Sequence, residues 1–149
     1  MTEQSKSPGK CLLEWMRARK LDGYGCVILA DDVRSVIGLE FPDVATKRVF
    51  DALALQELSA IGYVRTALLG EGKYLAQIDG DYRILLPSEN ARQIELYMSH
   101  ADKKLKRAQR LSRNTPKLDS EPRDNTAERI HMKRESIKNQ ITHGNCKAA

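Results

Sequence analysis

The sequence predicts an α+β protein, and three observations support this class. Apolar residues recur at helical spacing near the start of the chain and again over residues 44–61. Over residues 63–86 they alternate instead, and Asp79-Gly80 lies between two alternating runs, which is typical of a β-hairpin turn. Residues 90–113 return to a helical pattern and become basic after Ala101. We therefore expect a mixed body, a long C-terminal helix and a disordered basic tail.

Four segments follow from the places where the composition changes. Residues 1–9 are expected to form a flexible leader, and residues 10–89, which hold most of the apolar side chains, a folded body. Residues 90–113 form the long helix. Residues 114–149 have few apolar groups, so burial cannot offset the entropy of ordering them. We expect this tail to be disordered, with at most one transient helix near residues 126–140.

Composition excludes several classes of protein. The chain has 149 residues, of which 41% are hydrophobic and 30% are charged, which is enough for one core. Its longest apolar run, residues 26–30, is far shorter than the roughly 20 residues that cross a membrane. The polar start MTEQSKSPGK lacks the apolar stretch of a secretion signal, and the three cysteines include no CxxC pair. We expect a cytoplasmic protein, nucleoid-associated if its source is bacterial, with no membrane partner.

Charge is distributed unevenly along the chain. Residues 1–100 carry 12 Lys+Arg and 14 Asp+Glu, a net charge of −2, whereas residues 101–149 carry 13 and 6, a net charge of +7. Such a separation indicates a compact body with a cationic tail that meets nucleic acid or another polyanion. The alternative is a solvated tail that only keeps the protein soluble.

The first helix is expected to begin at Ser7-Pro8, with Ser7 as its cap and Pro8 in the first turn. Two glycines within residues 22–25 end it, and residues 26–29 then form a short buried strand. A second helix, capped by Asp31 or Asp32, ends at Gly38. Its inward face is formed by Val33, Val36 and Ile37.

A third helix is expected from about Val44, capped by Asp43 and closed by Gly62. Its apolar positions follow a 3.6-residue period and are expected to join the core: Val49, Phe50, Leu53, Leu58 and Ile61. Three strands follow, at residues 63–68, 73–78 and 82–86, because the apolar period there changes to two.

The order of these elements, together with three segments, resembles the winged helix-turn-helix superfamily. The segments are Leu29–Gly38, Thr46–Leu53 and Leu58–Arg65. The resemblance spans about residues 10–100 and implies a winged-helix domain over residues 10–89, in which the third helix reads DNA. The sequence departs from the pattern by an extra Phe41-Pro42 pair and by the third strand after that helix.

Candidate DNA contacts follow from this resemblance and from the need for cations near phosphates. The first turn of the third helix offers Thr46 and Lys47 for phosphates and Arg48 for a bidentate bond to guanine. Arg34 in the second helix is expected to reach the backbone. The expected hairpin, or wing, offers Arg65, Lys73 and Arg83. Each of these cations is otherwise an ordinary solvated charge on an amphipathic element.

The long helix adds a denser cluster of cations within eleven residues: Lys103, Lys104, Lys106, Arg107, Arg110 and Arg113. These side chains are expected to clamp phosphates without reading sequence. The same helix carries apolar residues at alternating spacings of four and three, which form a short heptad seam that predicts a homodimer. The seam consists of Ile94, Met98, Ala101, Leu105 and Ala108.

No pattern of an enzyme is present, and no cofactor is expected. The chain has no Gly-rich phosphate loop, and His131, His143 and Cys146 are too irregularly spaced to predict a zinc site. The leading hypothesis is a small DNA-binding protein, either a transcriptional regulator or an accessory factor, that binds double-stranded DNA or RNA. The alternative is a protein-binding module, an adaptor or inhibitor of viral or mobile-element origin, whose basic tail binds RNA or an acidic partner.

Overall fold

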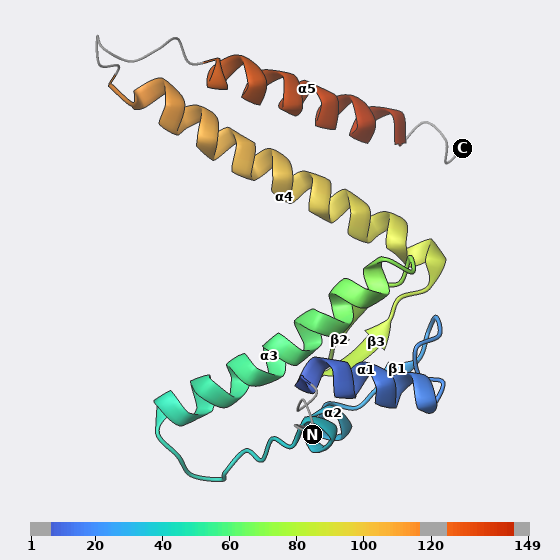
Figure 1. Ribbon diagram of the computed structural model, residues 1–149. Coiled ribbons are helices and arrows are strands. Elements are labelled where there is room, and N and C mark those ends of the chain that lie inside the picture. Colours follow the sequence, from blue (N-terminus) through green and yellow to red (C-terminus); the bar gives the residue numbers. More distant parts are fainter. Residues whose placement is uncertain (1–6, 117–124, 145–149) are drawn as a thin grey trace, which may run out of the picture. The chain divides into compact units, whose positions relative to one another are not determined.

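A computed structural model describes residues 7–116 and 125–144 of the chain (Figure 1). These residues form five helices and one three-stranded antiparallel sheet, so the protein is α+β, as the sequence predicts. The elements are α1 (Pro8–Ala18), β1 (Val27–Ile28), α2 (Ala30–Ile37), α3 (Lys47–Leu69), β2 (Leu75–Ile78), β3 (Asp81–Ile84), α4 (Pro87–Asn114) and α5 (Thr126–Gly144). The chain divides into two compact units, residues 1–90 and 91–149.

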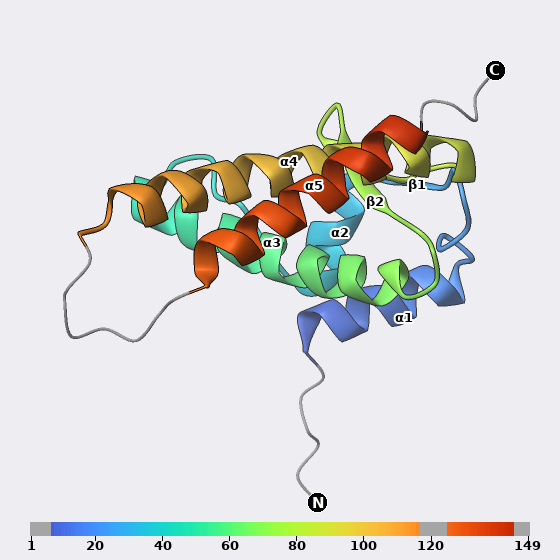
Figure 2. The same cartoon turned by 90° about the horizontal axis from the view of Figure 1, so that it is seen from above.

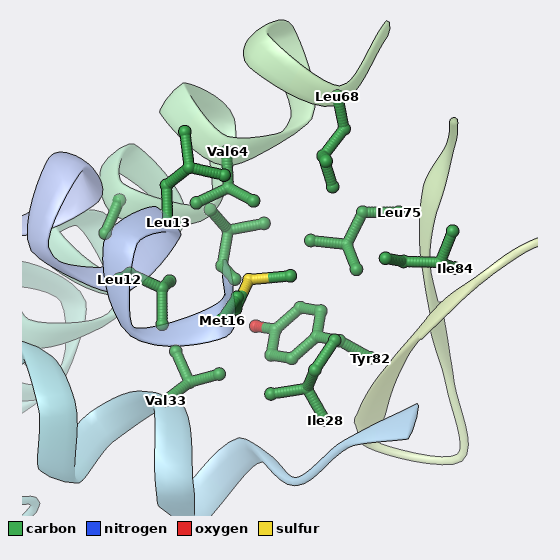
Figure 3. Close-up of a cluster of buried hydrophobic side chains, with 12 residues drawn as sticks. Leu12, Leu13, Met16, Ile28, Val33, Val64, Leu68, Leu75, Tyr82 and Ile84 are labelled. Carbon is green, nitrogen blue, oxygen red and sulfur yellow. The ribbon is translucent and has the colours of Figure 1, made fainter. Parts of the chain in front are cut away.

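The core of the first unit lies between α1, α2, α3 and the sheet. Figure 3 shows side chains from all of these elements converging on one cluster. Met16 is buried next to the ring of Tyr82, and Val64 is buried on the α3 side of the cluster, near Leu13. The other fully buried large side chains are Leu12, Ile28, Val33, Ile61, Leu68, Leu75 and Ile84.

Helix α1 begins as the sequence predicts. Ser7 occupies the N-cap, its side chain accepts a hydrogen bond of 3.4 Å from the Lys10 amide, and Pro8 lies in the first turn. Of the predicted leader, residues 1–6 lie outside the described residues, while Pro8 and Gly9 belong to α1. Gly9 faces α3 so closely that an added Cβ would lie 2.5 Å from the Cβ of Tyr63, so only glycine fits there.

The sheet has the strand order β1-β3-β2. The short strand predicted at residues 26–29 is β1, which pairs with β3 in the register Ile28↔Tyr82. The sequence predicts a buried strand, but only Ile28 is buried, since Val27 is 53% exposed. Strands β2 and β3 form the predicted hairpin, joined by Asp79 and Gly80. Both turn residues have positive φ, 53° and 90°, which is the backbone of a type I′ turn and explains the Asp-Gly pair.

The cap predicted for the second helix is wrong. Helix α2 begins at Ala30, so Asp31 and Asp32 lie in its first turn rather than at the cap, and Leu29 occupies the N-cap without a side-chain bond. The free amide of Ala30 instead donates to Asp81 Oδ1 of β3 at 2.9 Å. The end of α2 at Gly38, with φ of 71°, agrees with the prediction.

The bounds predicted for the third helix are also wrong. Helix α3 begins at Lys47 with Thr46 at the N-cap, so Asp43 is not its cap, and it continues through Gly62 to Leu69. The strand predicted at residues 63–68 is therefore helix, and two strands, not three, follow the helix in sequence. Alternation and helical spacing both fit this segment. The segment is helical because its apolar residues then continue the buried stripe of α3.

That stripe consists of Glu57, Ala60, Ile61, Val64 and Leu68. These positions are spaced three and four residues apart, so they share one face of a helix.

The first ten residues of α3 contain no buried side chain. Val49 is 44% exposed and Leu58 is 59% exposed, so neither joins the core as predicted. Phe50 and Leu53 are half-buried. In Figure 1 these turns extend beyond α1 and run beside the segment that links α2 to α3.

The second unit contains most of α4 and all of α5, which lie side by side and run in opposite directions in both views (Figures 1 and 2). A helix over Thr126–Gly144 occupies much of the stretch predicted to be a disordered tail. The prediction did not consider that this helix could pack against α4. The structure shows that it does, since Ile130 is only 8% exposed and Arg134 hydrogen-bonds to α4. Residues 117–124 and 145–149 of that tail lie outside the described residues.

Candidate nucleic-acid interface

The predicted contact cluster at the start of α3 is open to solvent. Thr46, Lys47 and Arg48 are exposed, and neither cation makes a hydrogen bond or ion pair within the described residues. The unpaired amides of a helix N-terminus attract anions, so this turn presents two cations and a favourable dipole to a phosphate. Arg48 lies on the side of α3 opposite the buried stripe, because successive residues of a helix are separated by 100°.

The structure does not bring Arg65 and Lys73, two of the three predicted wing cations, to this cluster. Arg65 lies on α3, not in the hairpin, and its Nε donates to the Leu75 carbonyl at 2.8 Å. Lys73 follows α3 and pairs with Glu71 at 3.2 Å. Eighteen residues of helix separate Lys47 from Arg65, which is a distance of about 27 Å. A single basic patch of Thr46–Arg48 with the predicted wing is therefore not formed.

The side chain of Arg34 makes its contacts within the first unit. Its Nε bonds to Glu57 Oε2 at 2.9 Å, and its guanidinium lies 4.6 Å from the centre of the Phe41 ring. Glu57, a buried residue of α3, also accepts a hydrogen bond of 3.0 Å from the Tyr82 hydroxyl. Burial, and then this bond to Glu57, raises the pKa of Tyr82 to about 12. The predicted phosphate contact of Arg34 would have to compete with a buried carboxylate.

Arg83 likewise has an internal partner. Its two terminal nitrogens bond to both oxygens of Glu89 in α4, at 2.7 and 3.0 Å. Glu89 also accepts from the Leu86 amide at 2.8 Å, and the hydrogen bond from Arg83 is the largest cause that lowers the pKa of this carboxyl. Bidentate pairs of this kind are geometrically specific, so Arg83 serves the start of α4 rather than a ligand.

The basic helix α4 differs from the body, because its cations are largely unpaired. All six predicted phosphate contacts are exposed. Lys106 pairs with Asp102 at 3.1 Å. The other five make no hydrogen bond or ion pair within the described residues: Lys103, Lys104, Arg107, Arg110 and Arg113.

Five of the six cations form one line along α4. Lys103, Arg107 and Arg110 follow one another at spacings of four and three residues, with Lys106 and Arg113 beside them, and these five residues are called the basic stripe below. Lys104 points to another side of the helix. The stripe covers ten residue steps, which is about 15 Å of helix.

Helix α5 packs against another side of α4, which adjoins the basic stripe at Asp102. Arg134 of α5 donates to Asp102 Oδ1 at 3.1 Å and to Gln109 Oε1 at 2.6 Å. Four half-buried residues of α4 share that side: Met98, Ala101, Leu105 and Gln109. Packing of α5 therefore leaves the basic stripe free, and neither Asp102 nor Arg134 was among the predicted site residues. The spacing of Asp102 and Lys106, four residues apart, predicts their ion pair, but it does not predict the contact with Arg134.

The predicted dimer seam overlaps the surface that α5 covers. Met98, Ala101 and Leu105 are half-buried there, whereas Ile94 is 57% exposed and Ala108 is exposed at the ends of the seam. A second copy would have to displace α5 before it could pair along the whole seam. The homodimer stays a prediction.

Charge divides between the two units as it does along the sequence. Residues 1–90 carry 11 Lys+Arg and 13 Asp+Glu, a net charge of −2, and residues 91–149 carry 14 and 7, a net charge of +7. The second unit is therefore the part of the chain that attracts a polyanion most strongly.

Comparison with protein-family models, with curated proteins and with solved structures found no match to this chain. Within the described residues no helix is long and apolar enough to cross a lipid bilayer. The same residues contain no cluster of three or more His, Cys, Asp or Glu side chains that could hold a metal ion. Of the irregular His/Cys set considered from the sequence, Cys146 and the side chain of His143 lie outside the described residues.

Proposed function

We propose that this protein binds double-stranded DNA, as a transcriptional regulator or an accessory factor. We propose further that the basic stripe of α4 provides most of its affinity for the phosphates. The single observation that carries the proposal is the stripe itself. Of its five cations, four are unpaired within the described residues, and α5 packs on another side of the helix. Each cation that neutralises a phosphate releases counterions, which gives affinity that falls steeply with salt.

The first turn of α3 provides the second contact. Lys47 and Arg48 are the exposed cations there, and both are unpaired within the described residues. The hydroxyl of the preceding Thr46 can donate a hydrogen bond to a phosphate. Arg48 is shaped for a bidentate bond to guanine, so it is the residue that reads sequence. This division assigns affinity to α4 and base choice to α3.

The layout of the first unit supports the same proposal. The order α1-β1-α2-α3-β2-β3, with β1 paired to β3, follows the order of a winged helix-turn-helix domain in which α3 is the recognition helix and the β2–β3 hairpin is the wing. The two-residue turn makes this wing short. Its one remaining predicted cation, Arg83, is paired with Glu89. The wing therefore contributes little positive charge.

The test compares two double variants that remove the same charge from the full chain. Lys103→Gln with Arg107→Gln removes two unpaired cations of the stripe, and Lys10→Gln with Lys20→Gln removes two exposed cations of the first unit. Affinity for a random-sequence duplex is measured as a function of salt. We expect the stripe variant to flatten the salt dependence by about two ions and the control to change it little. Equal effects of the two variants would contradict the proposal.

A second candidate function is favoured by one observation. The first half of α3 exposes two apolar side chains three residues apart on one side of the helix: Leu55 at 64% and Leu58 at 59%. Exposed apolar surface of this kind is typical of protein-binding sites. In that case the α3 surface binds a protein, and acidic substitutions at Leu55 and Leu58 abolish capture of that partner without changing the salt dependence of DNA binding.

A further inference from the structure

Asp102 occupies an unusual place in the basic half of α4. It is the only acidic residue between Leu96 and Pro116, and its side chain is 16% exposed. Both carboxylate oxygens are engaged: Oδ1 accepts from Arg134 of α5 at 3.1 Å, and Oδ2 accepts from Lys106 of the stripe at 3.1 Å. The Asp102 carboxylate thus links helix α5 to the basic stripe.

We infer that Asp102 limits how strongly the basic stripe binds a polyanion, because it withholds Lys106 from the phosphates, and that Arg134 holds Asp102 in that position. This role rests on the proposed function, since it concerns the same stripe. The ligand class is a phosphate or sulfate polyanion, with duplex DNA as the ligand that the rest of the stripe favours.

The electrostatics of the cluster support this role. The hydrogen bond from Arg134, followed by that from Lys106, lowers the pKa of Asp102, so the carboxylate stays charged at neutral pH. A charged carboxylate at the edge of the stripe repels phosphate and lowers the positive charge that Lys106 offers. An exposed pair between Asp and Lys is weak, but the bond from Arg134 and the limited exposure of Asp102 keep the carboxylate from turning away.

Arg134 is placed to fix this geometry rather than to contact the ligand. Its side chain is 16% exposed, and it spans Asp102 and Gln109, two turns apart on α4. A bond of Nε to one residue and of a terminal nitrogen to the other sets the orientation of the guanidinium. The planar fork of Arg suits such a two-point contact better than Lys does.

The test uses the full chain and two probes, a random-sequence duplex DNA and heparin, which is a polyanion without bases. Asp102→Asn keeps the shape of the side chain and can still accept from Arg134, but it loses its charge. Glu135→Gln is the matched control, because Glu135 also pairs with a lysine, Lys138 at 2.9 Å, on α5. We expect Asp102→Asn to raise affinity for both probes roughly threefold to tenfold and to steepen the salt dependence by about one ion. The control should change affinity less than Asp102→Asn does.

Lys106→Gln, in the wild-type and Asp102→Asn backgrounds, distinguishes local release of this cation from a general change in net charge. We expect the loss of Lys106 to reduce affinity little in the wild-type chain and severalfold more in the Asp102→Asn chain. Arg134→Lys should partly mimic Asp102→Asn, because it keeps the charge and removes the two-point contact. Hydrogen exchange of the α5 amides shows whether α5 stays folded in each variant.

Two outcomes overturn the inference. Equal gains for Asp102→Asn and Glu135→Gln would show that net charge alone matters, and an equal cost of Lys106→Gln in both backgrounds would show that Lys106 is not withheld. The proposed function fails separately, if the wild-type chain binds heparin but not duplex DNA. The heparin measurements still decide the role of Asp102 in that case.

Discussion

At the scale of single residues, Glu57 is the polar side chain that matters most for the stability of the first unit. It is the one buried charged side chain among the described residues, at 7% exposure, and it satisfies both oxygens with Arg34 and Tyr82. Burying a carboxylate is unfavourable unless it is paired, and removal of one partner exposes that cost. These contacts link α2, α3 and β3, and they take Arg34 out of the set of cations available to a ligand.

Tyr82→Phe is expected to lower the free energy of unfolding by about 1 kcal/mol at neutral pH, because it removes one donor to Glu57. Burial raises the pKa of Tyr82 to about 12 in the folded protein, above the value of about 10 in the unfolded chain. Between these pH values unfolding releases a proton, so wild-type stability falls as pH rises through this range. The variant lacks this loss, and the gap between the two proteins should narrow.

Urea unfolding at neutral pH and near pH 11 measures both effects. Tyr63→Phe is the control, because Tyr63 is 46% exposed. Parallel loss of stability in the wild-type and Tyr82→Phe proteins across the alkaline range would exclude the assigned role of Tyr82.

At the scale of elements, α2 depends on a cap from another part of the chain. Its own acids, Asp31 and Asp32, come one and two residues after Ala30 and make no cap bond to its amide, and Asp81 of β3 accepts from that amide instead. Position 81 follows the Asp79-Gly80 turn directly, so the turn that sets the hairpin register also aims the carboxylate at α2.

Asp81→Ala is therefore expected to destabilise the protein by about 1 kcal/mol, within the range for loss of an N-cap. Asp81→Asn should restore most of that stability, because its amide oxygen can accept the same bond. Asp32→Ala, which removes an exposed acid from the first turn of α2, should cost less, about 0.5 kcal/mol. Chemical denaturation of the three full-length variants ranks them. A larger loss for Asp32→Ala than for Asp81→Ala would restore the cap predicted from the sequence.

The same elements show what the sequence could predict. Local signals were sufficient where one segment contains the whole cause: Ser7-Pro8 starts α1, Gly38 ends α2, and Asp79-Gly80 forms the hairpin turn. They failed where a distant segment decides. Residues 63–68 fit a strand or a helix by their own pattern, and only burial against α1 and the sheet selects the helix.

The candidate site divides in the same way. Exposure of the α4 cations follows from the composition of that helix, so the sequence identified them. The bonds that engage Arg34, Arg65 and Arg83 join segments far apart along the chain or different elements, and charge patterning alone did not reveal them. The partner of α4 was missed for the same reason, because Arg134 lies 32 residues from Asp102.

At the scale of the whole molecule, affinity and sequence reading are assigned to different units. The second unit carries a net charge of +7 and the first a net charge of −2, so the first unit gains little from a nonspecific encounter with DNA. In the proposed function, the base preference of the chain comes from a few local contacts in the first unit. The start of α3 is where those contacts are available.

Alanine substitution of the two neighbouring cations of α3 separates base reading from phosphate contact. Arg48→Ala should weaken binding to a preferred duplex, selected from a random pool, by about 1–3 kcal/mol and relax base choice at one position. Lys47→Ala should weaken binding to the selected duplex and to its scrambled counterpart alike, and should reduce the salt dependence by about one ion. Both residues are exposed and unpaired within the described residues, so neither change should alter stability.

Equal losses on the two duplexes for Arg48→Ala would limit this turn to phosphate contact. If neither variant changes DNA binding, the first turn of α3 does not contact DNA and the second candidate function of α3, protein binding, is favoured.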